Sequence, residues 1–396
     1  MANSVLPEEL MLCILTRLPV KTIIRFKSVC KPWYRLFSTP EFKKLHQAQF
    51  SIDPKNQSFI VHSFDRHCSE PKNQFSIFNI ESGNKRPTIL NHPFANAQNV
   101  KLDTVGCCSG LICIGSGQEI VLWNPAMKLF KTVPLKDLGH SEMMSLGFGY
   151  DAIGDDFKVI RVVGVGRIEK GEGMNVTYAE IYSVNLGSWI TIDVSFHFIG
   201  PQTKNIMIVN GNPYWVARVD GNEVLVCFDV LELVFKIVPL PPIYGPGLDE
   251  KIGTEKEIDV EFVDWNGVVG AIVFDCEVEN LLGYVWTVHY SRLKCVWVFD
   301  DIEGIWRNHH TFRTNEVDLE VDTVLHCTKN EKILCTLPSG TLFVLDFVTG
   351  CVKELFDRSC IGISFKVYGY TESLAHINGM EKVVLKNEQN DLDVCF

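Results

Sequence analysis

Adjacent acidic residues and adjacent histidines are the side chains of this sequence that could do chemistry. Asp155 and Asp156 could serve as a general acid and base, and His309 and His310 could bind a metal ion. Neighbouring aspartates in a "GDDFK" turn are better placed to cap the turn than to flank a scissile bond. No carboxylate or cysteine stands at helical spacing from the histidines, which are expected in an exposed loop. We predict no catalytic residues, no metal site and no cofactor.

Glycine and cysteine patterns lead to the same expectation. The pairs Gly147-x-Gly149 and Gly164-x-Gly166 lack the third glycine and the following helix that a phosphate-binding loop requires. No Gly-x-Ser-x-Gly nucleophile motif occurs. The 14 cysteines form no C-x-x-C pair, and those in apolar runs such as "LVCFD" should behave as small hydrophobic residues. The sequence therefore favours a protein that binds over one that catalyses.

Length and composition limit where such a protein could act. With 396 residues, 46% of them hydrophobic, the chain can bury a large core. The segment "MANSVLPEEL" has no secretory pattern, and no apolar run reaches the roughly 20 residues of a membrane helix. We therefore expect reduced thiols, a cytoplasmic or nuclear location, and no membrane association.

Charge is divided unevenly along the chain. Residues 1–47 hold eight Lys and Arg against three Glu, a balance of +5, so the −11 of the whole chain leaves −16 for the rest. This asymmetry indicates an acidic partner for the first segment. We expect that partner not to be nucleic acid, because the segment lacks any known nucleic-acid-binding pattern and the acidic remainder would repel phosphate.

The first segment has the periodicity of short helices. Pro7 can begin a helix, and the apolar residues Met11, Ile14, Leu15 and Leu18 then recur at the spacing of one helical face. Prolines at 19 and 32 restart the chain, which gives three short helices in about 40 residues. So small a unit buries too little surface to be stable alone. It needs either a partner or the following domain, against which Trp33 and Leu36 would pack.

The remainder reads as short strands with a near-regular repeat. Six segments combine an apolar strand, a polar turn and a second strand, at residues 75–90, 120–135, 179–192, 224–241, 284–302 and 341–356. Their anchor residues Phe78, Trp123, Tyr182, Phe228, Trp286 and Leu345 stand 45 to 59 residues apart. Such a period is typical of four-stranded propeller blades. We predict an all-β propeller of about six blades, or seven if an irregular blade lies near the ends; a two-sheet sandwich suits the regular period less well.

Three long polar stretches interrupt this pattern and are candidates for binding loops. They cover residues 164–176, 245–259 and 303–320. The third holds Trp306, Arg307 and Arg313, residue types that anchor protein interfaces. We predict that these three side chains contact a protein target, while plain solvated loops remain the alternative.

The first segment resembles the F-box, the helical motif by which substrate receptors dock on the Skp-type adaptor of cullin-RING ubiquitin ligases. The matching positions include Leu6-Pro7, Leu18-Pro19-Val20 and Val29-Cys30-Lys31 with Trp33. The resemblance implies that the adaptor is contacted by Leu6, Pro7, Leu10, Ile14, Leu15, Leu18, Pro19, Val20, Ile23, Val29, Cys30, Trp33 and Leu36. It also implies that the basic residues face a generally acidic adaptor, and that the small helical core is completed by that partner.

The remainder resembles the plant F-box-associated domain, a kelch-like propeller. The matching stretches are "CCSGLICI", "LWNP", "GFGYD", "DDFKVIRV", "NGNPYW", "CFDV" and a late "YTESLAHI". The Gly-Gly doublets of true kelch repeats are absent, and the family's usual Ser-Cys-Asn-Gly-Leu is replaced by Cys107-Cys108-Ser109-Gly110-Leu111. The whole chain is similar to the group that includes the S-locus F-box proteins of pollen. We predict an F-box at 1–47, a linker at 48–56 and the propeller at 57–396.

These resemblances imply a receptor without chemistry of its own. The F-box would dock on the Skp-type adaptor, and through it on cullin and RING subunits, while the propeller would capture an unidentified protein for ubiquitylation. The alternative is a propeller hydrolase or lectin with a non-functional helical head. An intact Leu-Pro and Val-Cys-x-x-Trp pattern favours the receptor, since only that function requires it.

Overall fold

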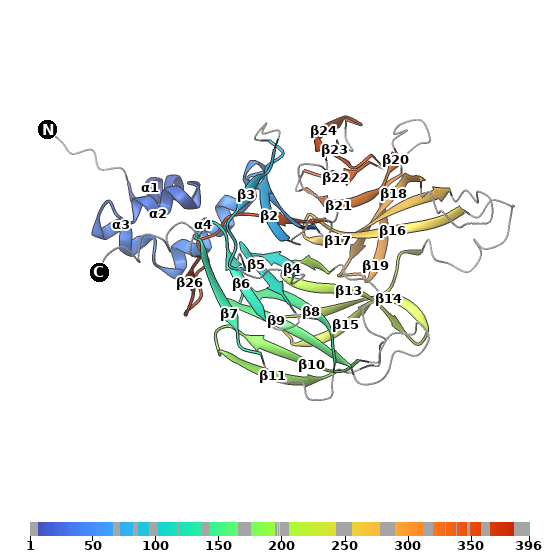
Figure 1. Ribbon diagram of the computed structural model, residues 1–396, viewed down its shortest axis with the longest axis horizontal. Coiled ribbons are helices and arrows are strands. Elements are labelled where there is room, and N and C mark those ends of the chain that lie inside the picture. The colour runs from blue at the N-terminus through green and yellow to red at the C-terminus, as the bar shows by residue number, and fades with distance from the viewer. Residues whose placement is uncertain are drawn as a thin grey trace. The chain divides into compact units, whose positions relative to one another are not determined.

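In the residues that it describes, the computed structural model places four helices before an all-β region (Figure 1). Helix α1 covers Glu8–Leu15, α2 Val20–Phe26, α3 Lys31–Leu36 and α4 Pro40–Ile52, and a 3-10 turn follows at Pro54–Asn56. The structure describes residues 7–65, 72–81, 86–94, 102–116, 119–135, 142–164, 176–194, 196, 198, 206–242, 256–277, 290–311, 320–328, 330–337, 339–346, 349–357 and 365–383. Among these residues, 1–135 and 362–396 contribute to one compact unit and 136–361 to another.

The four helices enclose a small apolar core. Leu15, Val20, Ile23, Phe37 and Phe42 are almost fully buried in it. The fourth helix was not expected, although Thr39 caps it by accepting a hydrogen bond from the Phe42 N–H and Pro40 stands at its first position. It continues past residue 47 to Ile52, so the predicted linker at 48–56 is partly helical.

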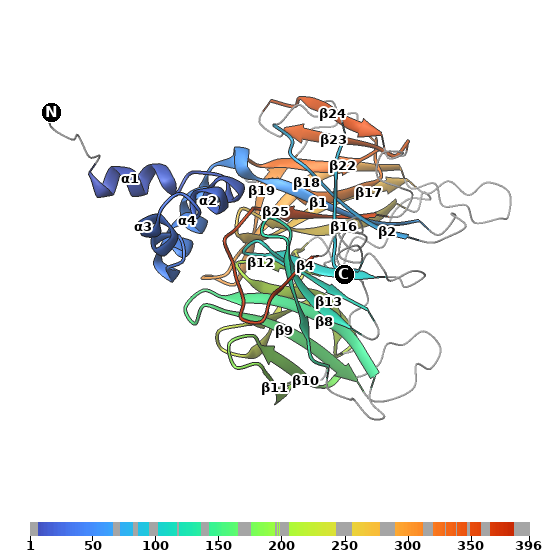
Figure 2. The ribbon, with the colours of Figure 1, turned by 60° about the vertical axis from the view of Figure 1, so that its left-hand side comes forward.

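In the described residues six antiparallel sheets follow, four with four strands and two with an added fifth strand, and they are the blades of a β-propeller, as predicted. Within the first unit, blade 1 consists of β25 (Phe365–Tyr370), β1 (Ser58–Asp65), β2 (Lys72–Phe78) and β3 (Thr88–Leu90). Blade 2 consists of β4 (Asp103–Cys108), β5 (Leu111–Gly115), β6 (Ile120–Asn124) and β7 (Leu129–Val133), with β26 (Glu381–Lys382) at its edge. Blade 1 thus combines strands from distant parts of the sequence, and Figure 2 shows red β25 beside blue β1.

The second unit contains the other four blades. Blade 3 is formed by β8 (Glu142–Asp151), β9 (Asp156–Gly164), β10 (Val176–Ser183) and β11 (Ser188–Asp193), and blade 4 by β12 (Met207–Val209), β13 (Asn212–Val219), β14 (Asn222–Asp229) and β15 (Val234–Val238). Blade 5 is formed by β16 (Lys256–Trp265), β17 (Val268–Glu277), β18 (Tyr290–Asp300) and β19 (Ile305–Thr311), with β20 (Glu320–Val321) pairing with β18. Blade 6 is formed by β21 (Thr323–Cys327), β22 (Lys332–Thr336), β23 (Thr341–Asp346) and β24 (Val352–Asp357).

Large side chains fill the spaces between successive blades of each unit. Trp123 and Phe75 meet edge to face between blades 1 and 2, with ring centroids 5.4 Å apart. Trp215 and Phe228 lie in the core shared by blades 3 and 4, and Trp265 and Phe343 in the core shared by blades 5 and 6. Truncating one such aromatic ring to alanine typically costs about 3–5 kcal/mol. The blades are therefore held together by apolar packing.

One type of turn joins the last two strands of blades 2 to 6, and we call it the outer turn. Its two ends are paired residues seven positions apart: Trp123 with Phe130, Tyr182 with Trp189, Phe228 with Phe235, Phe299 with Trp306, and Leu345 with Val352. The residue five positions after each anchor has positive φ, at Lys128, Gly187, Leu233, Gly304 and Gly350. An Asn, Ser or Asp directly follows each anchor and accepts a backbone hydrogen bond within the turn, as Asp229 does from Leu231 and Glu232.

Four of the six predicted strand-turn-strand segments contain an outer turn, and a fifth, 75–90, pairs β2 with β3 through a longer connection. The sixth prediction was wrong. The segment 284–302 was expected to fold back on itself, with Trp286 as its anchor. Its described part, from Tyr290, is the single strand β18, whose hairpin partner is β19. The anchor in blade 5 is Phe299, and Trp286 lies outside the described residues. The mistaken register came from placing the polar turn too early in a strand of 11 residues.

Candidate adaptor interface of the helical domain

Helix α1 presents an apolar pair to solvent. Leu10 and Ile14 stand four residues apart, which places them on one helical face, and each has 53% of its surface exposed. Pro7 precedes the helix as its N-cap and is exposed as well. Glu8 and Glu9 in the first turn favour the helix because they complement its positive end. An exposed apolar pair of this kind is available for a partner protein.

A second exposed apolar site lies between α2 and α3. Val29 is 63% exposed, and the neighbouring Cys30, the N-cap of α3, is exposed too. Pro19, the N-cap of α2, is exposed at the other end of that helix. Six described members of the predicted adaptor set are therefore exposed at the surface: Pro7, Leu10, Ile14, Pro19, Val29 and Cys30.

The other described members of that set lie in the helical core or pack against it. Leu15, Val20 and Ile23 are buried in the helical core, and Leu18, Trp33 and Leu36 pack partly against it. The Trp33 ring lies 5.1 Å from that of Phe26 and 6.0 Å from that of Phe37. Leu6 lies outside the described residues.

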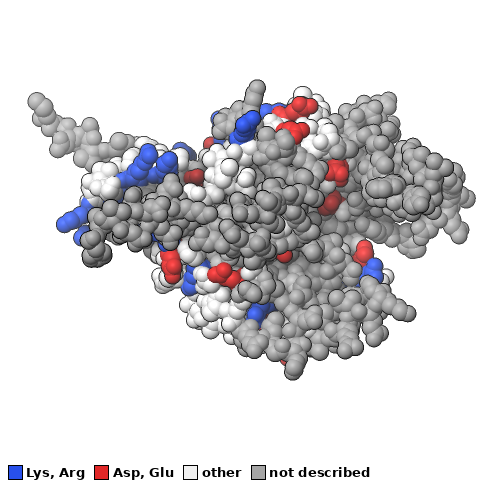
Figure 3. Space-filling view, viewed as in Figure 1, with Lys and Arg blue, Asp and Glu red and all other residues white. Residues whose placement is uncertain are grey.

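The surface around the exposed apolar residues is basic. Figure 3 shows Lys and Arg side chains on the part of the surface that α1 and α2 occupy in Figure 1. The exposed basic residues of the described helical domain are Arg17, in the turn between α1 and α2, and Lys21, Arg25, Lys31, Arg35 and Lys44 on the helices. Burial, and then the charge of Lys43, lower the pKa of Lys27. An acidic partner would relieve such repulsion between like charges.

Helix α4 contributes a histidine that sequence reasoning missed. His46 is fully buried, its Nε2 donates a hydrogen bond to the Leu18 carbonyl oxygen at 2.8 Å, and its ring stacks on Phe50 with centroids 5.2 Å apart. Its Nδ1 is buried without a hydrogen-bond partner among the described residues. Burial lowers the pKa of His46, so the ring is neutral in the folded domain. Phe42, His46 and Phe50 recur every four residues, a spacing that could have revealed this buried helical face.

The helical core is completed by residues from blade 2 and the segment after β25. Leu374, 1% exposed, packs inside it, and Ala126 and Met127 of the outer turn of blade 2 pack against it. We had expected a partner protein to complete this core. The structure shows instead that the chain's own later residues contribute to it, which corresponds to the alternative of a cap on the following domain. Leu10, Ile14 and Val29 nevertheless remain exposed.

Two of the three predicted target-binding residues lie on strand β19, so the prediction of a loop over residues 303–320 was wrong for 305–311. Trp306 Nε1 donates a hydrogen bond to the Pro239 carbonyl oxygen at 2.7 Å, and its ring lies 5.3 Å from that of Phe299. Arg307 forms ion pairs with Asp300 and Glu303 within the outer turn of blade 5. Arg313 lies outside the described residues.

The paired histidines also lie on β19 and not in a loop. His309 Nε2 is 3.6 Å from a Glu331 carboxylate oxygen, and its ring meets that of Trp265 edge on at 5.3 Å. Within the described ranges, no group of three or more His, Cys, Asp or Glu side chains could hold a metal ion. No helix of the described chain is long and apolar enough to cross a membrane.

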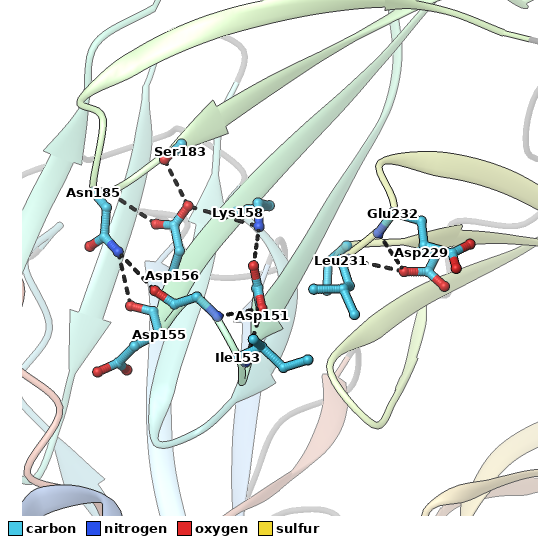
Figure 4. Close-up of polar contacts among 12 residues, drawn as sticks. Asp151, Ile153, Asp155, Asp156, Lys158, Ser183, Asn185, Asp229, Leu231 and Glu232 are labelled. Carbon is cyan, nitrogen blue, oxygen red and sulfur yellow. Dashed lines mark hydrogen bonds and ion pairs between the residues drawn. The ribbon is translucent and has the colours of Figure 1, made fainter. Parts of the chain in front are cut away.

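Asp155 and Asp156, considered above for acid and base chemistry, and the nearby Asp151 are engaged in turns of blade 3 (Figure 4). The Tyr150 hydroxyl donates a hydrogen bond to Asp155 Oδ1 at 2.7 Å. Asp156 is buried and accepts hydrogen bonds from Ser183 Oγ at 2.7 Å and from the Asn185 N–H at 2.9 Å. Asp151 accepts from Lys158 Nζ at 2.9 Å and from the Gly154 N–H at 2.8 Å. Burial raises the pKa of Asp151, but these hydrogen bonds outweigh it and lower the pKa overall. These carboxylates hold turns together, as the "GDDFK" pattern indicated.

Comparison with known families matches both parts of the chain. Residues 4–45 match the F-box domain, and residues 67–247 match the F-box associated beta propeller domain. A helical F-box followed by a propeller defines the class of protein. The chain carries an F-box followed by an F-box-associated propeller domain, and it is similar to F-box proteins of Arabidopsis thaliana.

Three of these relatives show the extent of the similarity. Two F-box proteins of Arabidopsis thaliana are 28% and 29% identical, covering 62% and 61% of this chain and 63% of each relative. An F-box/kelch-repeat protein of the same plant is 26% identical over 61% of this chain and 67% of its own length. The chain thus spans about three fifths to two thirds of the length of the curated relatives it matches.

Proposed function

We propose that this chain is the substrate-recognition subunit of an SCF-type ubiquitin ligase, in which the F-box binds a Skp-type adaptor that links it to cullin and RING subunits. The observation that carries the proposal is the apolar surface of Leu10, Ile14 and Val29, exposed on a basic domain that matches the F-box family. Burying such a surface against an acidic adaptor removes apolar area from water and adds attraction between opposite charges.

The propeller would capture a protein target, with Trp306, Arg307 and Arg313 as the proposed contacts. In such a complex the chain performs no chemistry. It raises the concentration of the target near the conjugating enzyme, and this proximity accelerates transfer. The hydrolase or lectin alternative receives no support from the described aspartates, which are engaged in turns. We place the receptor in the cytoplasm or nucleus, which microscopy of a tagged chain would test.

Adaptor capture tests this function directly. The double variant Leu10→Asp/Ile14→Asp should weaken binding of a Skp-type adaptor by about 100-fold or more, because it buries two charges in the interface core. Both side chains are half exposed, so the fold should survive. Leu18→Asp is a poorer probe, since Leu18 packs against the helical core.

The control is Ile153→Asp, at a residue that is 78% exposed in the β8–β9 turn of blade 3. It adds a charge to an exposed apolar position outside the F-box and should leave adaptor binding unchanged. Isothermal titration or pull-down with purified adaptor would measure both variants. Full adaptor binding by the double variant, or no binding by the unaltered chain, would contradict the proposed function.

A further inference from the structure

The segment that follows β25 contacts the F-box and blade 2 with alternate residues. Residues 371–377 are neither helix nor strand, and they lie after Tyr370, the last residue of β25. Burial raises the pKa of Glu372, while the nearby Val20 N–H at the start of α2 and the charge of Lys21 oppose that rise. Leu374 is buried in the helical core, and His376 lies near the charges of Lys27 and Lys43. The even-numbered residues thus meet the helices.

The odd-numbered residues are held by blade 2. Ser373 Oγ donates a hydrogen bond to the Ser109 carbonyl oxygen at 2.8 Å. The side-chain amide of Asn124 donates to the carbonyl oxygens of Ser373 at 3.1 Å and of Ala375 at 2.9 Å. The fit is close at Gly110, where an added methyl carbon would lie 2.1 Å from Ser373 Oγ. The β4–β5 and β6–β7 turns therefore fix this segment from one side.

The segment brings an acidic side chain to the N-terminus of helix α2. Its N-cap residue is Pro19, which provides no side-chain hydrogen bond to the first turn. A carboxylate at a helix N-terminus satisfies a free N–H group and complements the helix dipole. Glu372 supplies this group from a position more than 350 residues later in the sequence. Glu372 near the start of α2 and Leu374 in the helical core therefore connect the F-box to the segment that blade 2 holds.

We propose that Glu372, Ser373, Leu374 and Ala375 form a clamp that fixes the F-box to the propeller, so that ubiquitin transfer depends on the clamp while adaptor binding does not. This inference rests on the proposed ligase function. The exposed residues Leu10 and Ile14 are separate from Leu374, which is buried on the side of blade 2. A loosened F-box would still bind the adaptor, but it would hold the propeller in many orientations and so reduce productive encounters.

The test uses the full chain in a reconstituted complex with adaptor, cullin, RING subunit and conjugating enzyme. Transfer of ubiquitin to lysines of the chain outside residues 7–52 provides a readout that needs no identified target. The variant Glu372→Ala/Leu374→Ala should transfer about tenfold more slowly and bind the adaptor within about twofold of the unaltered chain. Amide hydrogen exchange at Val20 should accelerate, because the removed side chains hold the start of α2 against the segment.

Two matched variants separate the clamp from general destabilisation. Leu345→Ala truncates an equally buried leucine in blade 6 and should leave the transfer rate unchanged. Leu374→Met keeps the volume of the side chain and should retain transfer. Unchanged transfer by the double variant, or loss of its adaptor binding, would overturn the clamp. If the unaltered chain fails to bind the adaptor, the ligase function itself is wrong.

Discussion

The ammonium group of Lys236 lies 2.8 Å from the Asp229 carboxylate, and blade 5 repeats this pair with Arg307 and Asp300. In both blades the aspartate caps the outer turn and the basic residue stands seven positions later. A glutamate three residues after each aspartate completes the cluster, at Glu232 and Glu303. Arg307, predicted to bind a target, thus has a structural counterpart in the neighbouring blade.

This correspondence yields a controlled test of target binding. If Arg307 contacts the target, Arg307→Gln should weaken target binding, whereas Lys236→Gln should not. Both ion pairs are exposed to solvent, so neither change should affect stability appreciably. Target binding by purified variants, with thermal unfolding as a check on folding, would measure the difference. Equal binding by both variants would assign Arg307 to the turn alone.

The buried His46 should make the F-box sensitive to acid. Its pKa is lowered in the folded domain, so below about pH 6.5 the unfolded chain binds more protons than the folded one. The stability that neutral His46 provides is therefore present above pH 6.5 and is lost as the pH falls towards its folded pKa. His46→Gln, whose amide can donate to the Leu18 carbonyl, should reduce this dependence. Thermal midpoints at pH 7.5 and 5.5 would compare the two chains; identical shifts would contradict the role of His46.

The "GFGYD" and "NGNPYW" stretches meet where β8 packs against blade 4. The Tyr150 N–H donates to the Gly211 carbonyl oxygen at 3.0 Å, and a methyl carbon on Gly149 would lie 2.3 Å from that oxygen. Gly149→Ala should therefore lower the free energy of unfolding by about 1–3 kcal/mol or more. Gly187→Asn is the control, since Gly187 has φ of +66° with open space around it, and it should cost less than about 1 kcal/mol. Urea unfolding would measure both; equal costs would refute the close packing.

An isolated helical domain should be only partly folded. A fragment of residues 1–56 lacks Leu374, Ala126 and Met127, which cover the helical core in the full chain. We expect weak helical circular dichroism for the fragment and a gain on addition of a Skp-type adaptor, because the partner would bury part of the exposed apolar surface. A fully helical fragment without adaptor would show that these contacts are dispensable.

Local patterns in the sequence predicted three of the four described helices and about six blades, because both depend on short-range periodicity; the F-box was identified from a family resemblance. Helices α1, α2 and α4 begin at proline or threonine caps, and the strand-turn-strand repeats recur at regular intervals. The same approach misplaced the blade 5 anchor, since Trp286 and Phe299 both stand in apolar, β-branched surroundings. Only the turn chemistry of Asp300 and Gly304, which matches that of the other outer turns, distinguishes the correct register.

The contacts of the late segment could not be predicted in this way. Nothing near Leu374 indicates that its side chain enters a core formed by Leu15 and Ile23, because the two regions are far apart in sequence. "YTESLAHI" could be matched to a family, but a match does not reveal what each residue touches. Likewise, the exposed and the buried members of the predicted adaptor set are equally apolar. Leu15 is buried and Leu10 is exposed because α4 and blade 2 pack against one side of the helices only, which the sequence does not reveal.

Blade 1 and the helical core are both completed by residues that the ribosome adds late in synthesis. Helices α1–α4 and strands β1–β3 leave the ribosome nearly 300 residues before β25 and Leu374. At a synthesis rate of about 5–20 residues per second, the β1 edge of blade 1 and the helical core therefore stay uncovered for roughly 15–60 s. A message truncated before codon 365 would yield a chain in which neither is ever covered. Folding of the helices and of blade 1, the first parts to be synthesised, is thus completed only after this short segment has been translated.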